Sequence, residues 1–300
     1  MGKTAFLFPG QGSQYVGMAK DFADADPDVR EFVGRADAAL GIPLGEICFS
    51  GPEDRLKQTE FTQPAIFLHS IIVARKVPHL KPDMVAGHSL GEYSALVVAG
   101  AMEFVDALRL VRLRGELMQK AGTDNRGPMA AVMGMSAEQV EECCRTAADA
   151  GIVQPANYNS PGQIVISGSV DGVRKGMEIA KSRGAKVREL VVSGAFHSPL
   201  MEGAREGLKA GLDRTAIQDA RIPVYANVTG TPVTRAEEIR DLLYRQLTSP
   251  VRWEQTLQQM ARDGADTFYE RGPGKVLQNF VKRSVEGAAV AGFDRCADIH

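Results

Sequence analysis

A serine flanked by glycines, placed between an apolar segment and a helix, most restricts how this chain can fold. The segment Met84 to Ala86 predicts a buried strand, and Leu90 to Ala99 predicts a helix that Gly100 ends. The residues between them, GHSLG, fit the pattern G-x-S-x-G, in which small residues on both sides of Ser89 allow a sharp turn. A strand that turns directly into a helix indicates an α/β fold with Ser89 exposed at the turn.

The rest of the chain predicts further alternation of strands and helices around this turn. Near the N-terminus, TAFLFPGQGSQ predicts a buried strand and a Gly-rich turn, with a helix beginning at about Tyr15. A second helix is expected from Phe104 to Ala121, because apolar residues recur near one face. The segments RIPVYANVTG and ADTFYERGPGKVL continue the alternation toward the C-terminus.

The segment from about Asn125 to Val192 has a different order of elements. Four predicted strands and two predicted helices follow one another as β-α-β-β-α-β, which is typical of a ferredoxin-like unit. We therefore expect residues 125–195 to form a small subdomain inserted into a larger core that consists of residues 1–124 and 196–300.

Composition excludes several classes of function. Of the 300 residues, 44% are hydrophobic and 24% charged, as in ordinary soluble globular proteins, and the net charge of −2 argues against nucleic acid as the main partner. No apolar run reaches the roughly 18 residues of a membrane span, and we find no signal peptide. The four cysteines lack metal-binding spacing and are expected to be reduced thiols, so we predict a cytoplasmic protein without a metal site.

Ser89 permits two interpretations. In a strand–turn–helix setting the hydroxyl can act as a nucleophile, with the backbone N–H of Leu90 free to face a developing oxyanion. Alternatively, Ser89 is an N-cap in a Gly-rich turn.

A nucleophilic serine needs a base, and the chain has five histidines. His69 lies in an apolar helical segment, His79 in a Pro-flanked loop, and His88 is expected to point away from the serine. His300 is the last residue. His197, in VSGAFHSPLM, follows the last strand of the small unit on a Gly-containing loop, where catalytic groups usually lie, so it is the candidate base.

Together these motifs resemble the malonyl-CoA:acyl carrier protein transacylases of fatty acid synthesis. The resemblance covers nearly the whole chain and rests on a series of motifs in the same order: FLFPGQGSQ, TQPAIF, GHSLGEYSALVVAG, RLRGELMQ, NYNSPGQIVISG, SGAFHSPLM, NVTG, QLTSPVRW and ERGPGKVL. It implies a hydrolase-like parallel-sheet α/β core with an inserted ferredoxin-like subdomain. It also implies that Ser89 attacks the thioester of malonyl-CoA while His197 takes its proton.

The resemblance assigns further residues. The backbone N–H groups of Gln11 and Leu90 would form the oxyanion hole, and the Arg114 guanidinium would bind the malonyl carboxylate, whereas Arg109 and Arg112 would face solvent. Gln11 could otherwise belong to a phosphate-binding loop, but Tyr15 stands where the third glycine would be.

Four more positions follow from the resemblance. No acidic residue is placed to orient His197, and the backbone carbonyl of Gln246 would do so instead. Phe196 would crowd an α-methyl branch on the substrate, while Gln63 and Asn159 would be scaffold contacts near the site.

The implied acceptor is the phosphopantetheine thiol of holo acyl carrier protein, so this chain, expected to be a monomer, would need no cofactor. Candidate basic docking patches are Lys181 to Arg188 and Lys282 with Arg283, although both also fit ordinary solvated surface. Three alternatives stay open: a serine thioesterase or other hydrolase, a discrete trans-acting acyltransferase of a polyketide synthase, and a non-catalytic carrier-binding protein.

Overall fold

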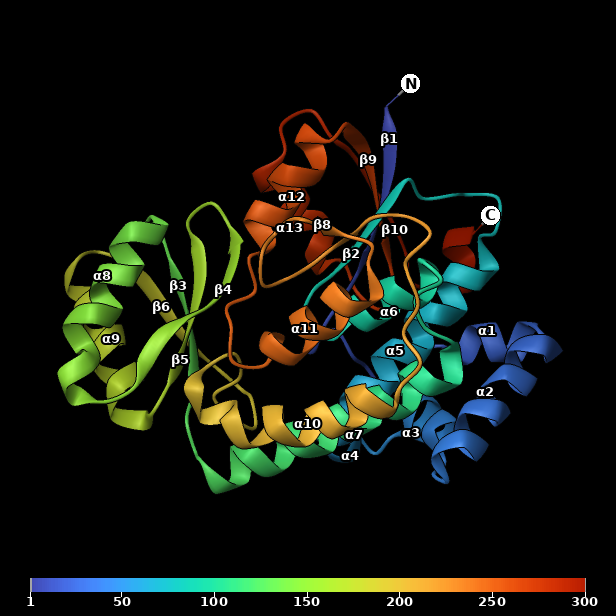
Figure 1. Ribbon diagram of the computed structural model, residues 1–300, viewed down its shortest axis with the longest axis horizontal. Helices are drawn as coiled ribbons and strands as arrows, with labels where there is room; N and C mark the ends of the chain where they lie inside the picture. Colours follow the sequence, from blue (N-terminus) through green and yellow to red (C-terminus); the bar gives the residue numbers. More distant parts are fainter. Residues whose placement is uncertain (1, 300) are drawn as a thin grey trace.

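The computed structural model describes residues 2–299 and contains two separate sheets (Figure 1). The larger sheet has six strands in the order β10-β9-β1-β2-β7-β8 and is parallel except for β8. Its strands are β1 (Lys3–Phe8), β2 (Met84–Gly87), β7 (Val224–Tyr225), β8 (Pro232–Val233), β9 (Ala265–Arg271) and β10 (Ala289–Phe293).

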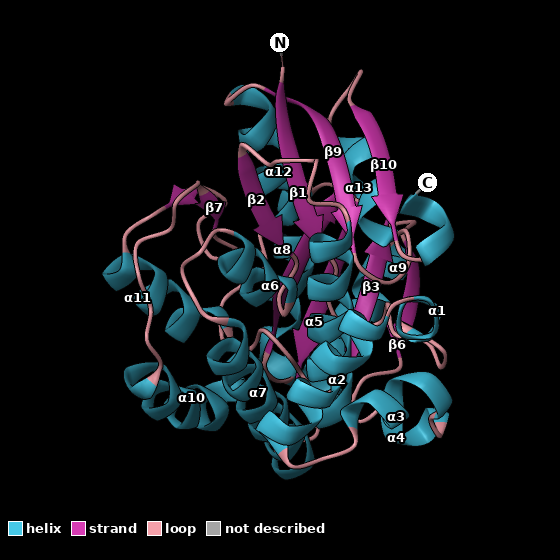
Figure 2. Cartoon of the chain, turned by 90° about the vertical axis from the view of Figure 1, so that its right-hand side faces the viewer, coloured by secondary structure: helices cyan, strands magenta, loops and turns pink. Residues whose placement is uncertain are grey.

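Helices cover both faces of this sheet, which is why β2 and the Ala5–Phe8 part of β1 are apolar (Figure 2). On one face, Ala5 and Leu7 pack with Trp253 and Phe280, which come from two C-terminal helices. On the other face, Phe6 and Phe8 join the largest apolar core. The covering helices are α12 (Trp253–Arg262) and α13 (Val276–Ser284) on the first face, and α5 (Thr59–Lys76), α6 (Gly91–Val98) and α7 (Phe104–Asp124) on the second.

The remaining helices of the α/β core surround the second face and the lower end of the core in Figure 1. They are α1 (Lys20–Ala25), α2 (Pro27–Leu40), α3 (Leu44–Ser50), α4 (Glu53–Leu56), α10 (Glu202–Arg214) and α11 (Ala236–Gln246), with short 3₁₀ turns at Pro199–Met201 and Cys296–Ile299. Within residues 2–299, no helix is long and apolar enough to cross a bilayer.

The second sheet is antiparallel and has its own small apolar core. Its strands lie in the order β4-β5-β3-β6, and its two helices pack against one another. The elements are β3 (Met129–Met133), α8 (Ala137–Ala147), β4 (Val153–Ser160), β5 (Gln163–Gly168), α9 (Val170–Ser182) and β6 (Lys186–Leu190), with a 3₁₀ turn at Ala148–Ala150. This order and topology confirm the predicted ferredoxin-like unit beside a parallel α/β core.

One predicted helix start is wrong. We expected a helix from about Tyr15, but α1 begins at Lys20, and the preceding residues form turns. Gly17 and Ala19 both have positive φ angles, of 99° and 61°, which a right-handed helix cannot contain. The Gly17 N–H donates to the Cys48 carbonyl instead of to a helical partner.

Close packing explains the glycines of the G-x-S-x-G turn. A Cβ atom at Gly91 would lie 2.1 Å from the carbonyl oxygen of Phe8 at the end of β1. One at Gly87 would lie 1.8 Å from the carbonyl carbon of Gly91. The turn after β2 therefore packs directly against β1 and the first residue of α6, and only glycine at positions 87 and 91 avoids a steric clash.

We predict that Gly91→Ala destabilises the fold by about 2–3 kcal/mol, because neither backbone segment at the contact can move without disturbing the sheet. Chemical denaturation monitored by circular dichroism measures this change.

Gly34→Ala is the matched control. Gly34 lies in α2, and a Cβ atom there would meet no atom within 4 Å. This variant should be neutral or more stable by up to about 1 kcal/mol. Equal behaviour of the two variants would show that the contact with Phe8 is unimportant.

Candidate active site

Ser89 lies at the end of β2 in a strained backbone conformation. Its φ is 52°, and its N–H donates to Oδ1 of Asn227 over 2.6 Å. Asn227 also donates from Nδ2 to the Gly87 carbonyl, so one side chain holds both sides of the turn. The N-cap of α6 is Leu90 and no side chain caps this helix, so the interpretation of Ser89 as an N-cap is wrong.

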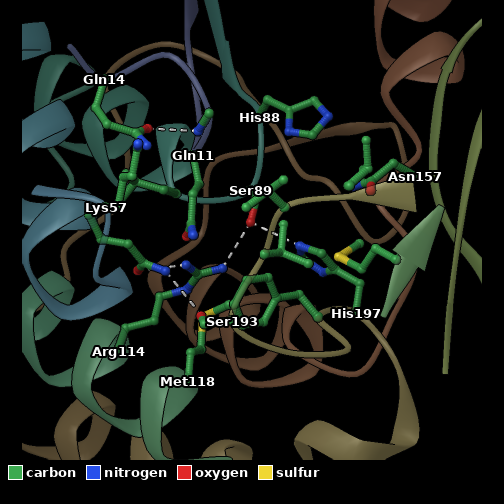
Figure 3. Close-up of a pocket in the computed structure, with 18 residues that line it drawn as sticks. Gln11, Gln14, Lys57, His88, Ser89, Arg114, Met118, Asn157, Ser193 and His197 are labelled. Carbon is green, nitrogen blue, oxygen red and sulfur yellow. Dashed lines mark hydrogen bonds between the residues drawn. The ribbon is translucent and has the colours of Figure 1, made fainter. Parts of the chain in front are cut away.

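The Ser89 hydroxyl meets two functional side chains from distant parts of the chain (Figure 3). Its Oγ is 2.9 Å from Nε2 of His197 and accepts a hydrogen bond of 3.0 Å from Nη2 of Arg114. The structure thus brings together three of the residues that the sequence singled out.

His197 is held on both sides. Its Nδ1 lies 2.9 Å from the Gln246 carbonyl, the group that the resemblance implies, and 3.2 Å from the Ser249 carbonyl. Carbonyl oxygens only accept, so Nδ1 carries the hydrogen and Nε2 directs its lone pair at Ser89. The residue has a left-handed φ of 57°, and Nε2 of Gln154 binds its carbonyl oxygen.

Burial, together with the nearby charge of Arg114, lowers the pKa of His197 to about 3, while the hydrogen bond to the Gln246 carbonyl opposes the shift. The imidazole is therefore neutral at physiological pH. A neutral ring is the form that can take a proton from a serine.

Arg114 comes from α7 and is completely buried. Besides the bond to Ser89, Nη1 donates to Oε1 of Gln63 over 2.8 Å, and Nη2 donates to Oε1 of Gln246 over 2.9 Å. The Tyr93 ring lies 5.6 Å from the guanidinium. Burial lowers the pKa of Arg114 from its ordinary value. Each hydrogen bond ends on a neutral oxygen atom, so the positive charge remains available for an anion.

The two residues whose N–H groups are expected to form an oxyanion hole line the same cavity as Ser89. Gln11 and Leu90 both line it, and within residues 2–299 neither N–H donates to another protein atom. The Gln11 side chain is fixed by a hydrogen bond from Nε2 to Oγ1 of Thr59. Free N–H groups beside a nucleophile are what a tetrahedral oxyanion requires.

The cavity has a volume of about 360 Å³. Ser89, His197 and Arg114 lie on its wall with Phe196, and Lys57 and the fully exposed Val191 also line it (Figure 3). Ten of the 18 lining residues have polar side chains, so a ligand in this cavity would meet many hydrogen-bonding groups.

The remaining predicted residues divide between the cavity and its support. Gln63 and Phe196 line the cavity. Asn159 is not among the lining residues, and its Oδ1 is 2.9 Å from Nε2 of His88. The His88 ring points away from Ser89, as expected (Figure 3). His69 is buried core, with Nε2 2.7 Å from the Asp294 carbonyl. His300 lies outside the described residues.

The expectation for one arginine of α7 is wrong. Arg109 is exposed as predicted, but the Arg112 side chain is only 16% exposed. It forms ion pairs of 2.6 Å with Glu60 and Glu116 and lies over the Phe61 ring. These contacts hold it against α5 rather than in solvent.

Three supporting residues were not predicted from the sequence. Asn227 fixes the serine turn, Gln154 fixes the carbonyl of His197, and the buried Glu92 accepts from Gln246. Asn227 belongs to the NVTG motif, and Glu92 is an acidic residue in an otherwise apolar helix, so both left a signal. Gln154 left none, because its neighbours are those of an ordinary strand.

Comparison with known proteins agrees with this geometry. Residues 5–297 match the family model described as acyl transferase domain. The malonyl CoA-acyl carrier protein transacylase of Bacillus subtilis is 46% identical over 287 residues, covering 94% of this chain and 90% of that protein. Its Haemophilus influenzae counterpart is 44% identical over 290 residues, covering 95% and 93%. The chain belongs to the malonyl-CoA:acyl carrier protein transacylase family.

Solved structures of the family superpose closely. The Coxiella burnetii transacylase has a TM-score of 0.96 at 38% identity, over 99% of this chain and 96% of that one. A malonyl-transacylase in complex with its holo type II PKS acyl-carrier protein has a TM-score of 0.95 at 39% identity, over 99% and 97%. Both confirm the α/β fold with its two sheets.

We predict that the His197 ring stays neutral, with the hydrogen on Nδ1, from pH 8 down to about pH 4. Burial lowers its pKa in the folded chain below that in the unfolded chain, so its contribution to stability is complete above about pH 6.5 and declines as the pH falls toward 3. Nuclear magnetic resonance of ¹⁵N-labelled histidine measures the ring state, with His197→Gln identifying the signal. A His197 ring that titrates near pH 6.5 would contradict the buried geometry.

Proposed function

We propose that this chain transfers the malonyl group of malonyl-CoA to the phosphopantetheine thiol of holo acyl carrier protein through an ester on Ser89. One observation carries the proposal: Ser89 Oγ is hydrogen-bonded both to His197 and to the buried Arg114. A nucleophile, its base and a cation for the free carboxylate of the substrate thus meet at one atom. The names of the relatives support the same reaction.

In the first half-reaction, Oγ of Ser89 attacks the thioester carbonyl carbon and its proton passes to Nε2 of His197. The resulting oxyanion accepts from the N–H groups of Gln11 and Leu90, each of which is worth about 2.7–4 kcal/mol in comparable sites. Collapse breaks the carbon–sulfur bond, and the CoA sulfur takes the proton from His197. Malonyl-Ser89 remains.

In the second half-reaction, the carrier's thiol gives its proton to His197 and its sulfur attacks the ester carbonyl. The same N–H groups stabilise the second oxyanion, and collapse returns the proton to Ser89. The Gln246 and Ser249 carbonyls keep Nδ1–H in place throughout, and they stabilise the imidazolium less than a carboxylate would.

Arg114 holds the malonyl carboxylate in both steps. Its guanidinium can present two parallel N–H groups to a carboxylate, and burial strengthens the attraction. Phe196 lies in the cavity wall, where its ring would crowd an α-methyl branch, which favours malonyl over methylmalonyl groups.

We also infer that residues 125–195 are an inserted subdomain and that residues 1–124 and 196–300 form the catalytic core. All strands of the second sheet lie between Met129 and Leu190, which supports these boundaries. We also propose a monomer, and free thiols at the four cysteines fit a cytoplasmic location.

Fatty acid elongation is the proposed destination of the malonyl group. The polyketide alternative shares every site residue, and one solved relative is in complex with a PKS carrier. The rate of discharge of malonyl-Ser89 by a holo fatty acid carrier, compared with a holo polyketide carrier, separates the two. Faster discharge by the polyketide carrier would overturn the assignment.

We predict that malonyl-CoA alone adds one malonyl group to the protein, because Ser89 is the only acceptor that the first half-reaction needs. Intact mass spectrometry should show the adduct on the wild type and none on Ser89→Ala, and holo carrier protein should remove it. Free malonate without a lasting adduct would indicate a hydrolase instead. An unmodified protein with intact malonyl-CoA would favour a non-catalytic carrier-binding protein.

We predict that Arg114→Ala lowers kcat/KM for malonyl-CoA by about 10- to 100-fold, the effect of losing a hydrogen-bonded charge, and leaves acylation by acetyl-CoA within about three-fold of wild type. Acetyl-CoA lacks the carboxylate that Arg114 would bind. Arg112→Ala, two residues along the same helix and outside the cavity wall, is the control and should change neither rate. An equal loss with both substrates would remove Arg114 from the proposed role.

A further inference from the structure

A buried carboxyl group lies beside the proposed nucleophile and takes no part in the steps above. Glu92 is in the first turn of α6, three residues after Ser89, and is 3% exposed. Its Oε2 accepts hydrogen bonds from the Asn227 N–H over 3.1 Å and from Nε2 of Gln246 over 2.7 Å. A buried acidic group is costly unless it is well partnered, so its retention here needs a reason.

The partner Gln246 connects three parts of the site. Its backbone carbonyl accepts from His197, its side-chain Oε1 accepts from Arg114, and its Nε2 also donates to the Ser89 carbonyl over 3.1 Å. The two ends of an amide side chain differ only in hydrogen bonding, so neighbouring groups decide which end faces which way. At Gln246 the oxygen must face the guanidinium for the Arg114 bond to exist.

We propose that Glu92 is a positioning residue for Arg114, because its acceptor oxygen, together with the Ser89 carbonyl, holds the amide of Gln246 in the one orientation that directs Oε1 at the guanidinium. The inference rests on the proposed role of Arg114 in binding the malonyl carboxylate. With the amide reversed, two N–H groups would face the guanidinium, which has donors only. Arg114 would then lose one of its three acceptors.

Protonation does not remove this role. Burial raises the pKa of Glu92 to about 7, while the bonds from Gln246 and Asn227 and the charge of Arg114 oppose the shift. A carboxyl that carries its proton on Oε1 still accepts at Oε2. The glutamine in Glu92→Gln also offers an acceptor oxygen, so an uncharged acceptor is enough.

The base does not depend on the amide. Nδ1 of His197 is held by the backbone carbonyls of Gln246 and Ser249, which stay in place when the side chain of residue 246 turns. Loss of the acceptor at Glu92 therefore affects the substrate's carboxylate more than the attack by Ser89. This difference separates positioning of Arg114 from general support of the fold.

The experiment measures acylation of Ser89 by malonyl-CoA and by acetyl-CoA. Glu92→Leu, which is similar in size and has no acceptor, should lower kcat/KM for malonyl-CoA by about 10- to 100-fold, mainly through KM, and change the acetyl-CoA value by less than about three-fold. Glu92→Gln should stay within about three-fold of wild type for both substrates. Equal losses with the two substrates in Glu92→Leu, or a malonyl-specific loss as large in Glu92→Gln, would overturn the proposal.

Gln246→Ala provides a second route if Glu92→Leu does not fold. It removes the amide and keeps the carbonyl that binds His197, so it should show the same malonyl-specific loss. In the Gln246→Ala background, Glu92→Leu should cause no further malonyl-specific loss, because the two residues act through one contact. Additional loss in the double variant would contradict the proposal.

Glu270 supplies a matched control. It is also buried, burial also raises its pKa to about 7, and its carboxyl accepts from the N–H groups of Leu277 and Gln278, away from the cavity. Glu270→Leu should lower the thermal unfolding temperature without a malonyl-specific loss. Arg114→Ala is measured in parallel: a malonyl-specific loss there but not in Glu92→Leu rejects only the Glu92 inference, and equal losses with both substrates in Arg114→Ala reject the proposed role of Arg114 itself.

Discussion

The positive charge of Arg114 is buried in the middle of the protein, and its three hydrogen bonds end on the neutral oxygens of Gln63, Ser89 and Gln246. Removing a charge from water costs several kcal/mol, and these three hydrogen bonds do not end on an anion that would offset this cost directly. The surrounding elements must place the acceptors well to limit that cost. Much of the site can be understood as the structure needed to keep one cation buried and available to a substrate carboxylate.

Backbone strain at the two reacting residues adds to this cost. Ser89 and His197 both have left-handed φ angles, and such non-glycine residues cost about 1–3 kcal/mol each. Asn227 binds the turn at Ser89, and Gln154 binds the carbonyl of His197. In these strained conformations, Oγ of Ser89 and Nε2 of His197 face one another. The hydrogen bonds of Asn227 and Gln154 keep the two backbone segments in these conformations.

The antiparallel sheet helps to hold the catalytic base in place. Gln154, which holds His197, belongs to β4, and this strand exchanges backbone hydrogen bonds with Val251 through Ala156 and Tyr158. Val251 follows shortly after Ser249, whose carbonyl faces the imidazole. The second sheet is therefore attached to the core at the chain segment that orients the base.

The amino-acid sequence by itself determined the local features. The G-x-S-x-G turn, the alternation of strands and helices and the β-α-β-β-α-β order follow from spacing within short segments, and glycine at positions 87 and 91 reflects contacts close to the turn. The start of α1 was misjudged, because the positive φ of Ala19 leaves no pattern in the sequence. Only the tertiary structure decided which polar side chains support the reacting groups. Glu92 and Gln246 are 154 positions apart, and a glutamine in a helix looks like a surface residue until folding places a carboxylate and a guanidinium at its two ends.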